Sequence, residues 1–318
     1  MEKRILYSEL TNIGTLENPI YYYKQTPFNG IIYNIYSNGE LVFEGSIKDG
    51  KRDGLQKYWS ENGKIWSEEN FKDGKKEGPH KEWFNDGKLK RAINFKDNKM
   101  NGLQTLWHEN GKLNAEWYYL DGIQDGLQKN WNENGKLDYE WNYLDGIQDG
   151  LQKGWYENGK LRHEDNYKDG RESGLQLRWY ENGDFLEVNN YKDGVRDGLQ
   201  KRWYENGKLE YEANFKDGVQ DGLQKKWYEN GKLESEANFK DGELNGLLKS
   251  WFENGKLETE SNFLDGEIDG LQKSWHENGK LETESNSIGG LLNGQSKSYD
   301  KNGQLIEDLY WENDETID

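Results

Sequence analysis

Histidines and carboxylates are the side chains of this 318-residue chain best suited to acid–base or metal chemistry. The four histidines, His80, His108, His163 and His276, lie far apart in the sequence and suggest no metal-ligand cluster. Carboxylates are abundant, but they recur throughout with lysines as partners, and no cysteine is present to act as a nucleophile. The sequence therefore predicts no catalytic residues, no metal site and no cofactor, and we expect a protein that is not an enzyme.

Short glycine-containing motifs superficially suggest ligand loops. The stretches "DGVRDG" and "DGIQDG" resemble calcium loops, but an EF-hand needs a longer set of oxygen ligands ending in a distal Glu. Phosphate-binding glycine loops lead into a helix, whereas the glycines here lead into segments of strand character. Turn formation is enough to explain both motifs.

A fixed period organises nearly the whole chain. One glycine recurs every 24 residues from Gly30 to Gly294, and a second from Gly39 to Gly303, preceded by Asn in all copies but one, which has Asp86. A third recurs from Gly50 to Gly290, with Asn98 as its one substitute. Such regularity without insertions indicates structural units stacked on one another.

Each copy is predicted to form one β-hairpin. In the copy that starts at Gly198, Asn206-Gly207 and Asp217-Gly218 are dipeptides favoured by two-residue type I′ turns. Between and beyond these turns lie "KLEYEANFK" and "VQDGLQKKWYE", which have strand length and are rich in aromatic residues. A two-residue turn at Asn206-Gly207 places Lys201 opposite Glu212.

Differences among the copies support this register. Where the lysine becomes Leu177, its predicted partner becomes Val188, as expected for direct cross-strand contact. The same register places Gly198 opposite Phe215, and Leu209 on the face that does not carry Lys201. Neither face is purely apolar, so the sequence predicts an all-β fold: an elongated single-layer antiparallel β-meander of about twelve 24-residue hairpin repeats.

Three regions are expected along the chain. Residues 1–29 lie outside the period and are predicted to form an N-terminal cap. Residues 30–309 form the repeat array, and residues 310–318 form an acidic C-terminal tail.

Net charge narrows the class of partner. The formal charge of −18 repels nucleic-acid and anionic membrane surfaces and attracts basic proteins. We expect a protein partner of basic character, no nucleic acid and no membrane, and the oligomeric state stays open. The absence of cysteine and of a secretory signal favours a cytoplasmic location.

Departures from the consensus suggest where a partner binds. One copy carries an uncharged face, and two others carry bulky aromatic residues at and near the position that the small residue Ala213 occupies in the copy starting at Gly198. An apolar patch ringed by charge is typical of an interaction hot spot, although such changes could also merely repack a drifting repeat. The candidate partner-binding residues are Leu175, Leu177, Trp179, Leu186, Val188, Trp117, Tyr139 and Trp141.

The pattern G-x-x-x-x-W-Y-x-N-G-K-L-x-x-E-x-x-F-K-D-G, taken from residues 198–218, resembles the bacterial variant of the MORN repeat. It is especially similar to the YwqK-type antitoxin family, and "FNGIIYNIYSNGELVFEGSIKDGKRDG" at residues 28–54 looks like a first copy of that kind. The resemblance covers roughly residues 28–310. It implies an antitoxin or immunity partner of a toxin, or a scaffold, and brings no catalytic residues.

Two hypotheses follow. The first is a non-enzymatic protein that binds another protein, with an antitoxin or immunity factor against a basic toxin as its specific form. The alternative is a structural spacer within a larger assembly, which the near-uniform copies favour because a spacer needs length more than a unique site.

Overall fold

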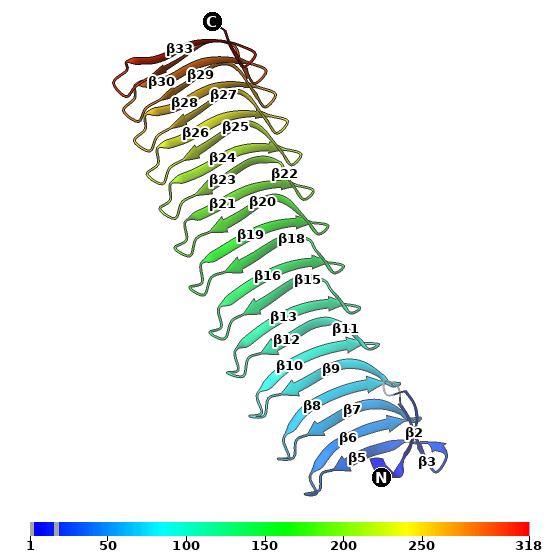
Figure 1. Cartoon of the computed structure of the whole chain (residues 1–318). Coiled ribbons are helices and arrows are strands. Elements are labelled where there is room, and N and C mark those ends of the chain that lie inside the picture. Colours follow the sequence, from blue (N-terminus) through cyan, green and yellow to red (C-terminus); the bar gives the residue numbers. More distant parts are fainter. Residues whose placement is uncertain (1–2, 16–18, 318) are drawn as a thin grey trace. The chain divides into compact units, whose positions relative to one another are not determined.

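A computed structural model describes residues 3–15 and 19–317, which fall into two compact units, Met1–Gly159 and Lys160–Asp318. In each unit the strands follow one another as antiparallel hairpins in a single layer (Figure 1). The described part of the chain contains one helical element, the 3-10 turn η1 (Tyr7–Glu9). No helix in that part is long and apolar enough to cross a bilayer.

The strands of the two units are as follows. In the first unit they are β1 (Arg4–Leu6), β2 (Thr11–Gly14), β3 (Pro19–Tyr23), β4 (Thr26–Pro27), β5 (Gly30–Ile35), β6 (Leu41–Lys48), β7 (Lys51–Trp59), β8 (Ile65–Lys72), β9 (Lys75–Trp83), β10 (Leu89–Lys96), β11 (Lys99–Met100), β12 (Gly102–Trp107), β13 (Leu113–Leu120), β14 (Ile123–Gln124), β15 (Gly126–Trp131), β16 (Leu137–Leu144), β17 (Ile147–Gln148) and β18 (Gly150–Trp155). In the second unit they are β19 (Leu161–Lys168), β20 (Arg171–Trp179), β21 (Phe185–Lys192), β22 (Val195–Arg196), β23 (Gly198–Trp203), β24 (Leu209–Lys216), β25 (Val219–Trp227), β26 (Leu233–Lys240), β27 (Glu243–Trp251), β28 (Leu257–Leu264), β29 (Glu267–Trp275), β30 (Leu281–Ile288), β31 (Leu291–Leu292), β32 (Gly294–Tyr299), β33 (Leu305–Glu312) and β34 (Glu315–Ile317).

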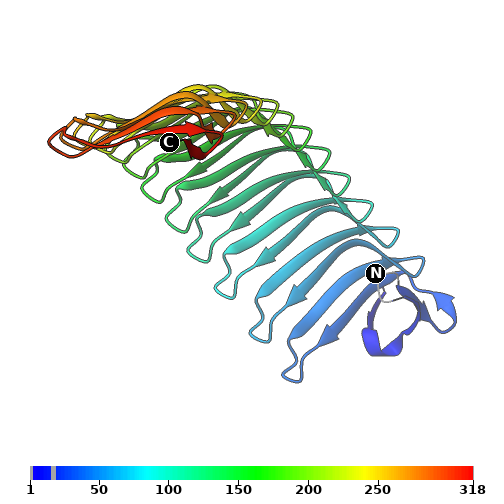
Figure 2. The same cartoon turned by 45° about the horizontal axis from the view of Figure 1, so that its top comes forward.

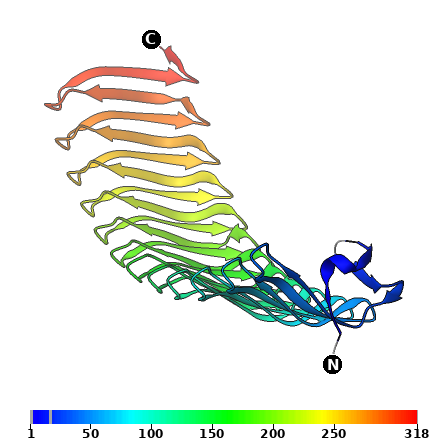
Figure 3. The ribbon, with the colours of Figure 1, turned by 90° about the horizontal axis from the view of Figure 1, so that it is seen from below.

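Strand order follows chain order in both units, which confirms the open antiparallel hairpin sheet. In the first unit β1 is an exception, because it pairs in parallel with β5, with Arg4 opposite Ile31. Strands β2, β3 and β4 form a separate small sheet beside the first hairpins, shown in blue in Figure 2. In the second unit the yellow-to-red hairpins lie side by side in one layer (Figure 3), and β34 pairs with β33 at its end.

The two predicted turns differ in type. Asp217 and Gly218 have φ values of 49° and 84°, which confirms a two-residue type I′ turn. The same prediction for Asn206-Gly207 is wrong, because only Gly207 has a positive φ, of 80°. Its N–H donates to the Tyr204 carbonyl at 2.9 Å, and the Tyr204 N–H donates to the Lys208 carbonyl at 2.9 Å. This is a three-residue loop, a type I turn closed by a glycine bulge.

The bulge changes the predicted faces next to the turn. Lys201 lies opposite Glu212, as predicted, but Trp203 then lies opposite Leu209, because the ladder shifts by one residue. Leu209 was therefore placed on the wrong face. Glu210 has no cross-strand partner at the bulge, and its carboxylate binds Arg202, with each oxygen 2.7 Å from a guanidinium nitrogen.

A second irregularity occurs where each repeat joins the next. Gly198 lies opposite Phe215, as predicted, but its φ of 97° shows that glycine is needed there for a bulged backbone. Across the bulge, the Gln200 side chain donates to the Asn190 carbonyl at 2.9 Å, and the Asn190 side chain donates to the Leu199 carbonyl. Side chains thus replace backbone hydrogen bonds that the bulge interrupts.

Turns of successive repeats are also joined by hydrogen bonds. From one turn, the Tyr204 hydroxyl donates to the Trp227 carbonyl at 2.8 Å. The Asn206 amide donates to the Glu229 carbonyl at 3.0 Å, and Lys208 Nζ to the Asn230 carbonyl at 2.7 Å. The repeated "YENGK" therefore encodes stacking of one repeat on the next.

An apolar core is found at the start of the first unit. Ile5, Tyr21, Phe28, Ile32 and Ile47 form one buried cluster, so that residues from the N-terminal segment cover the first hairpins. Further along, the residues with the least exposure are small or amide side chains, such as Ala213 and Gln200. The array is thus held mainly by its hydrogen-bonded ladders, as in other repeat proteins with nearest-neighbour contacts.

Candidate functional site

The two faces of the sheet carry different sets of side chains. On the ladder face, which we define by Leu199, Lys201, Glu212, Asn214 and their equivalents, Lys201 Nζ lies 2.9 Å from the Glu212 carboxylate. Glu212 also lies opposite Lys225 of the next repeat. These side chains are about one-third exposed, so each ion pair contributes little to stability.

The opposite face, which we call the variable face, is defined by Gln200, Arg202, Tyr211, Ala213 and their equivalents. In the first unit, residue types change from copy to copy much more on this face than on the ladder face. The positions equivalent to Glu212 are Glu44, Glu68, Ala92, Glu116 and Glu140, whereas those equivalent to Tyr211 are Phe43, Ser67, Arg91, Ala115 and Tyr139.

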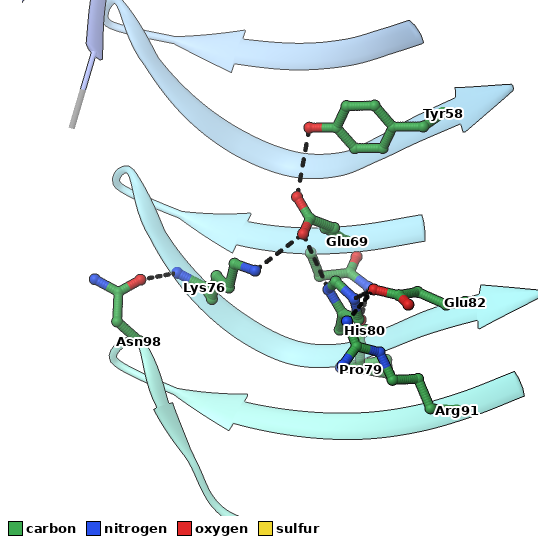
Figure 4. Close-up of polar contacts among 9 residues, drawn as sticks. Tyr58, Glu69, Lys76, Pro79, His80, Glu82, Arg91 and Asn98 are labelled. Atoms are coloured by element: carbon green, nitrogen blue, oxygen red, sulfur yellow. Dashed lines mark hydrogen bonds and ion pairs between the residues drawn. The ribbon is translucent and has the colours of Figure 1, made fainter. Parts of the chain in front are cut away.

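A charged cluster lies on the variable face of β8, β9 and β10 (Figure 4). It consists of Glu69, Lys76, His80, Glu82 and Arg91. Lys76 Nζ is 2.9 Å from Glu69, and His80 lies between the two glutamates, with each ring nitrogen 3.1 Å from a carboxylate oxygen. The contact of Nδ1 with Glu69 lacks hydrogen-bond geometry. Arg91 pairs with Glu82, as the register predicted.

Charges in this cluster stabilise each other in a site with little water. Burial alone would raise the pKa of Glu69, but the contacts from His80 and Lys76 outweigh it and lower that pKa to about 2. The pKa of Glu82 is likewise lowered, because Arg91 and His80 outweigh its burial. Burial raises the pKa of the neighbouring Tyr58 to about 12.

This arrangement suits binding and rigidity. With a pKa near 2, Glu69 holds no proton to donate at neutral pH. Among residues 3–15 and 19–317, no three His, Asp or Glu side chains are grouped as a metal site would require. The cluster instead fixes three neighbouring strands by ionic contacts between them.

An aromatic cluster follows on the same face. Tyr139 and Trp141 stack with ring centroids 4.7 Å apart, and Trp117 Nε1 donates to the Asn130 side chain at 3.0 Å. Asn130 lies opposite Tyr139. The structure thus brings together the three aromatic residues singled out in the sequence, all of them partly buried.

Cross-strand pairs connect the two clusters. Arg91 lies opposite Leu106, which lies opposite Ala115. Ala115 in turn lies opposite Asn130, next to the stacked rings. The charged and aromatic clusters therefore belong to one continuous strip of the variable face.

The second candidate patch lies on the ladder face of the second unit. Leu177 is opposite Val188, which confirms the register inferred from their joint change. Trp179 lies opposite Phe185, with ring centroids 5.4 Å apart, so Phe185 takes the place predicted for Leu186. The turn bulge is again the cause. Leu175 is 46% exposed and Phe185 45%, which leaves an apolar surface open to solvent.

Sequence reasoning missed the charged cluster. It also missed the ion pair of Arg178: Glu187 is its cross-strand neighbour, in agreement with the predicted register, but the guanidinium pairs with the buried Asp165. A signal was present, because His80 and Glu69 replace the consensus Gln and Ala at positions that pair across strands. The joint change that revealed Leu177 and Val188 would have revealed this pair as well.

Comparisons with known proteins identify the repeat. No curated protein matches the chain. The MORN repeat variant matches ten segments: residues 52–73, 76–97, 100–121, 124–145, 148–169, 196–217, 220–241, 244–265, 268–287 and 292–313.

Similarity to solved structures is weak. The chain has 11% identity to a structure of TcdB2-TccC3, covering 94% of the chain and 19% of that protein, with a TM-score of 0.20. A Photorhabdus luminescens Tc holotoxin pore gives 14% identity, 93% and 16% coverage, and a TM-score of 0.19. A putative 6-phosphogluconolactonase from Bacteroides fragilis gives 12% identity, 98% and 99% coverage, and 0.13.

The chain spans only about a fifth of the TcdB2-TccC3 proteins, and TM-scores this low establish no shared fold. The ten repeat matches, by contrast, cover more than half of the chain and coincide with its 24-residue hairpins. Repeats of this kind often mediate protein interactions and are generally non-enzymatic. The chain belongs to the MORN repeat variant family.

Proposed function

We propose that this chain is a non-enzymatic protein that binds another protein through the variable face of its first unit. One observation carries the proposal: in the first unit, residue types at positions equivalent to Lys201 and Glu212 on the ladder face change little. Those at positions equivalent to Arg202, Tyr211 and Ala213 on the variable face change and gather into charged and aromatic clusters. A ladder needed only for folding has no reason to vary on one side. A surface that recognises a partner does.

We further propose that the partner is basic, in the form of a toxin that this chain neutralises in the cytoplasm as an antitoxin or immunity factor. The net charge of −18 supports a basic partner, because opposite charges accelerate association. The resemblance of the repeats to YwqK-type antitoxins supports the proposal that this partner is a toxin.

Co-purification from the native host tests the proposal. Trp117→Ala combined with Trp141→Ala introduces the small residue that Ala213 supplies in the consensus, so the fold should persist while the partner is lost. Leu177→Lys combined with Val188→Glu restores the consensus ladder pair and removes the other patch. Partner retention by both double variants, or recovery of no protein partner by the wild type, would refute the proposal. If only the second double variant loses the partner, the binding site lies on the ladder face instead.

A structural spacer is the second candidate, favoured by the near-identical copies at residues 197–216 and 221–240. Deletion of one whole repeat discriminates the two functions. A spacer should lose function by a similar amount whether residues 102–125 or 222–245 are removed. A binding protein should lose its partner with the first deletion and keep it with the second.

A further inference from the structure

A groove opens on the variable face of the first unit, beside the turns that follow β9 and β12. It has a volume of about 550 Å³ and is continuous with a neighbouring hollow of about 460 Å³, with which it shares Phe84, Lys90 and Glu109. Arg91, Trp107 and Glu133 also line it. We call it the turn groove.

Departures from the consensus make this groove. In the copy that starts at Gly198, the Tyr204 hydroxyl donates a hydrogen bond to the next repeat, and the Glu210 carboxylate pairs with Arg202. At the groove, Phe84 takes the place of Tyr204 and has no hydroxyl, and Lys90 takes the place of Glu210. The carboxylate that Glu210, Glu234, Glu258 and Glu282 place at this position in later copies is therefore missing here, and a cation takes its place.

The cations of the groove have unused bonding capacity. Lys90 makes no ion pair with any residue in the described ranges, and its Nζ lies over the Phe84 ring, 5.9 Å from the centroid. Glu109 and Glu133, the carboxylates that line the groove, form no ion pair with it, and Glu82 is already engaged by Arg91 and His80. Arg91 Nε is buried and has no hydrogen-bond partner.

We propose that the turn groove binds an aspartate or glutamate side chain of the protein partner. Its carboxylate lies at Lys90 and Arg91, and its methylene groups pack against Phe84 and Trp107. The carboxylate restores from outside the kind of ion pair that Glu210 and Arg202 form within the chain. This inference rests on the proposed protein-binding function and names the partner's anchor.

The charge around the groove indicates which residues should lie next to the acidic side chain in the partner. Glu109 and Glu133 are exposed turn residues at the rim, and the chain as a whole is strongly negative. Basic residues on either side of the partner's acidic residue would face these rim carboxylates. The site therefore selects an acidic side chain within a basic segment, which a uniformly basic surface does not offer.

Two labelled peptides test the anchor directly: acetyl-KKFEKK-amide and acetyl-KKFQKK-amide, which differ in one carboxylate. Fluorescence anisotropy with the full chain at 50 mM salt should show about tenfold tighter binding of the Glu peptide, as one charge-assisted hydrogen bond supports. Lys90→Glu should abolish that preference. Lys226→Glu makes the same charge change at an exposed site in the second unit and should preserve it.

Phe84→Tyr provides a second variant, which should reduce the preference by filling the groove with the consensus hydroxyl and adds no charge. Equal binding of the two peptides to the wild type, or no binding of either, overturns the groove assignment. So does a preference that survives in Lys90→Glu. Co-purification decides the wider proposed function independently, so failure of one is distinguishable from failure of the other.

Discussion

Replacement of Glu69 by glutamine tests the energetics of the charged cluster. The lowering of the Glu69 pKa from its ordinary 4.5 to about 2 corresponds to roughly 3 kcal/mol of stabilisation. The side chain is only 14% exposed, so solvent screens these contacts little. Glutamine keeps the shape but removes the charge, and it leaves Lys76 and His80 with a buried neutral neighbour. We expect Glu69→Gln to weaken this region by about 3 kcal/mol at pH 7.

The contribution of Glu69 to stability should depend on pH in a definite direction. A carboxylate whose pKa is lowered by folding stabilises the folded state fully above its unfolded pKa of 4.5. That stabilisation is lost as the pH falls from about 4.5 towards 2, because the unfolded state then takes up the proton first. The difference between wild type and Glu69→Gln should therefore be largest at neutral pH and shrink in acid.

Local measurements suit a repeat protein, whose hairpins can open separately. Amide hydrogen exchange at pH 7 should show faster opening of β8 and β9 in Glu69→Gln than in wild type. Thermal unfolding of both proteins at pH 7, 4 and 2.5 should show the stability deficit of Glu69→Gln shrinking as the pH falls. Glu236→Gln is a matched control, because that carboxylate pairs with Lys225 on the exposed ladder face and should contribute less than about 1 kcal/mol. Equal stability of Glu69→Gln and wild type at pH 7, or a deficit unchanged at pH 2.5, would refute the reasoning.

Three further predictions concern the repeat itself. Gln200→Ala should cost about 1–3 kcal/mol, because the partly buried Asn190 carbonyl loses its partner at the bulge; hydrogen exchange of β23 checks this, and unchanged protection would contradict it. Gly207→Ala should cost about 1 kcal/mol because of its φ of 80°, while Gly207→Asn should cost less; equal melting temperatures of the two variants would count against this. Leu177→Lys with Val188→Glu should change stability by less than about 1 kcal/mol, because it restores an exposed ladder pair; a large fall in melting temperature would show that the apolar pair is needed for packing.

Much of the fold could be predicted from local patterns. Register followed from pairs that change together, such as Leu177 with Val188, because the two side chains touch across one ladder. The Asp217-Gly218 turn was predicted correctly, since both residues tolerate positive φ. The candidate aromatic residues Trp117, Tyr139 and Trp141 also proved to be neighbours, because equivalent positions of successive repeats lie side by side.

The positions of side chains next to the bulges were less predictable. A bulge adds a residue to one strand without altering the 24-residue period. Nothing in the order of residues therefore indicates that Glu210 turns towards Arg202, or that Phe185 replaces Leu186 opposite Trp179. The roles of Gln200 and Asn190 were hidden for the same reason. Their partners are backbone groups, which look alike in every sequence.

The sequence alone determined the repeat, the hairpin, the ladder register and the sign of the net charge, because each depends on residues near one another or one period apart. Only the tertiary structure decided that His80 lies between two carboxylates, that Lys90 forms no ion pair with any described residue, and that a groove opens beside it. These features arise where several strands crowd charged side chains into a small volume. In such a volume, the cation that forms an ion pair with a given carboxylate is decided by differences in distance of a few ångströms. The order of residues in the sequence does not specify these distances.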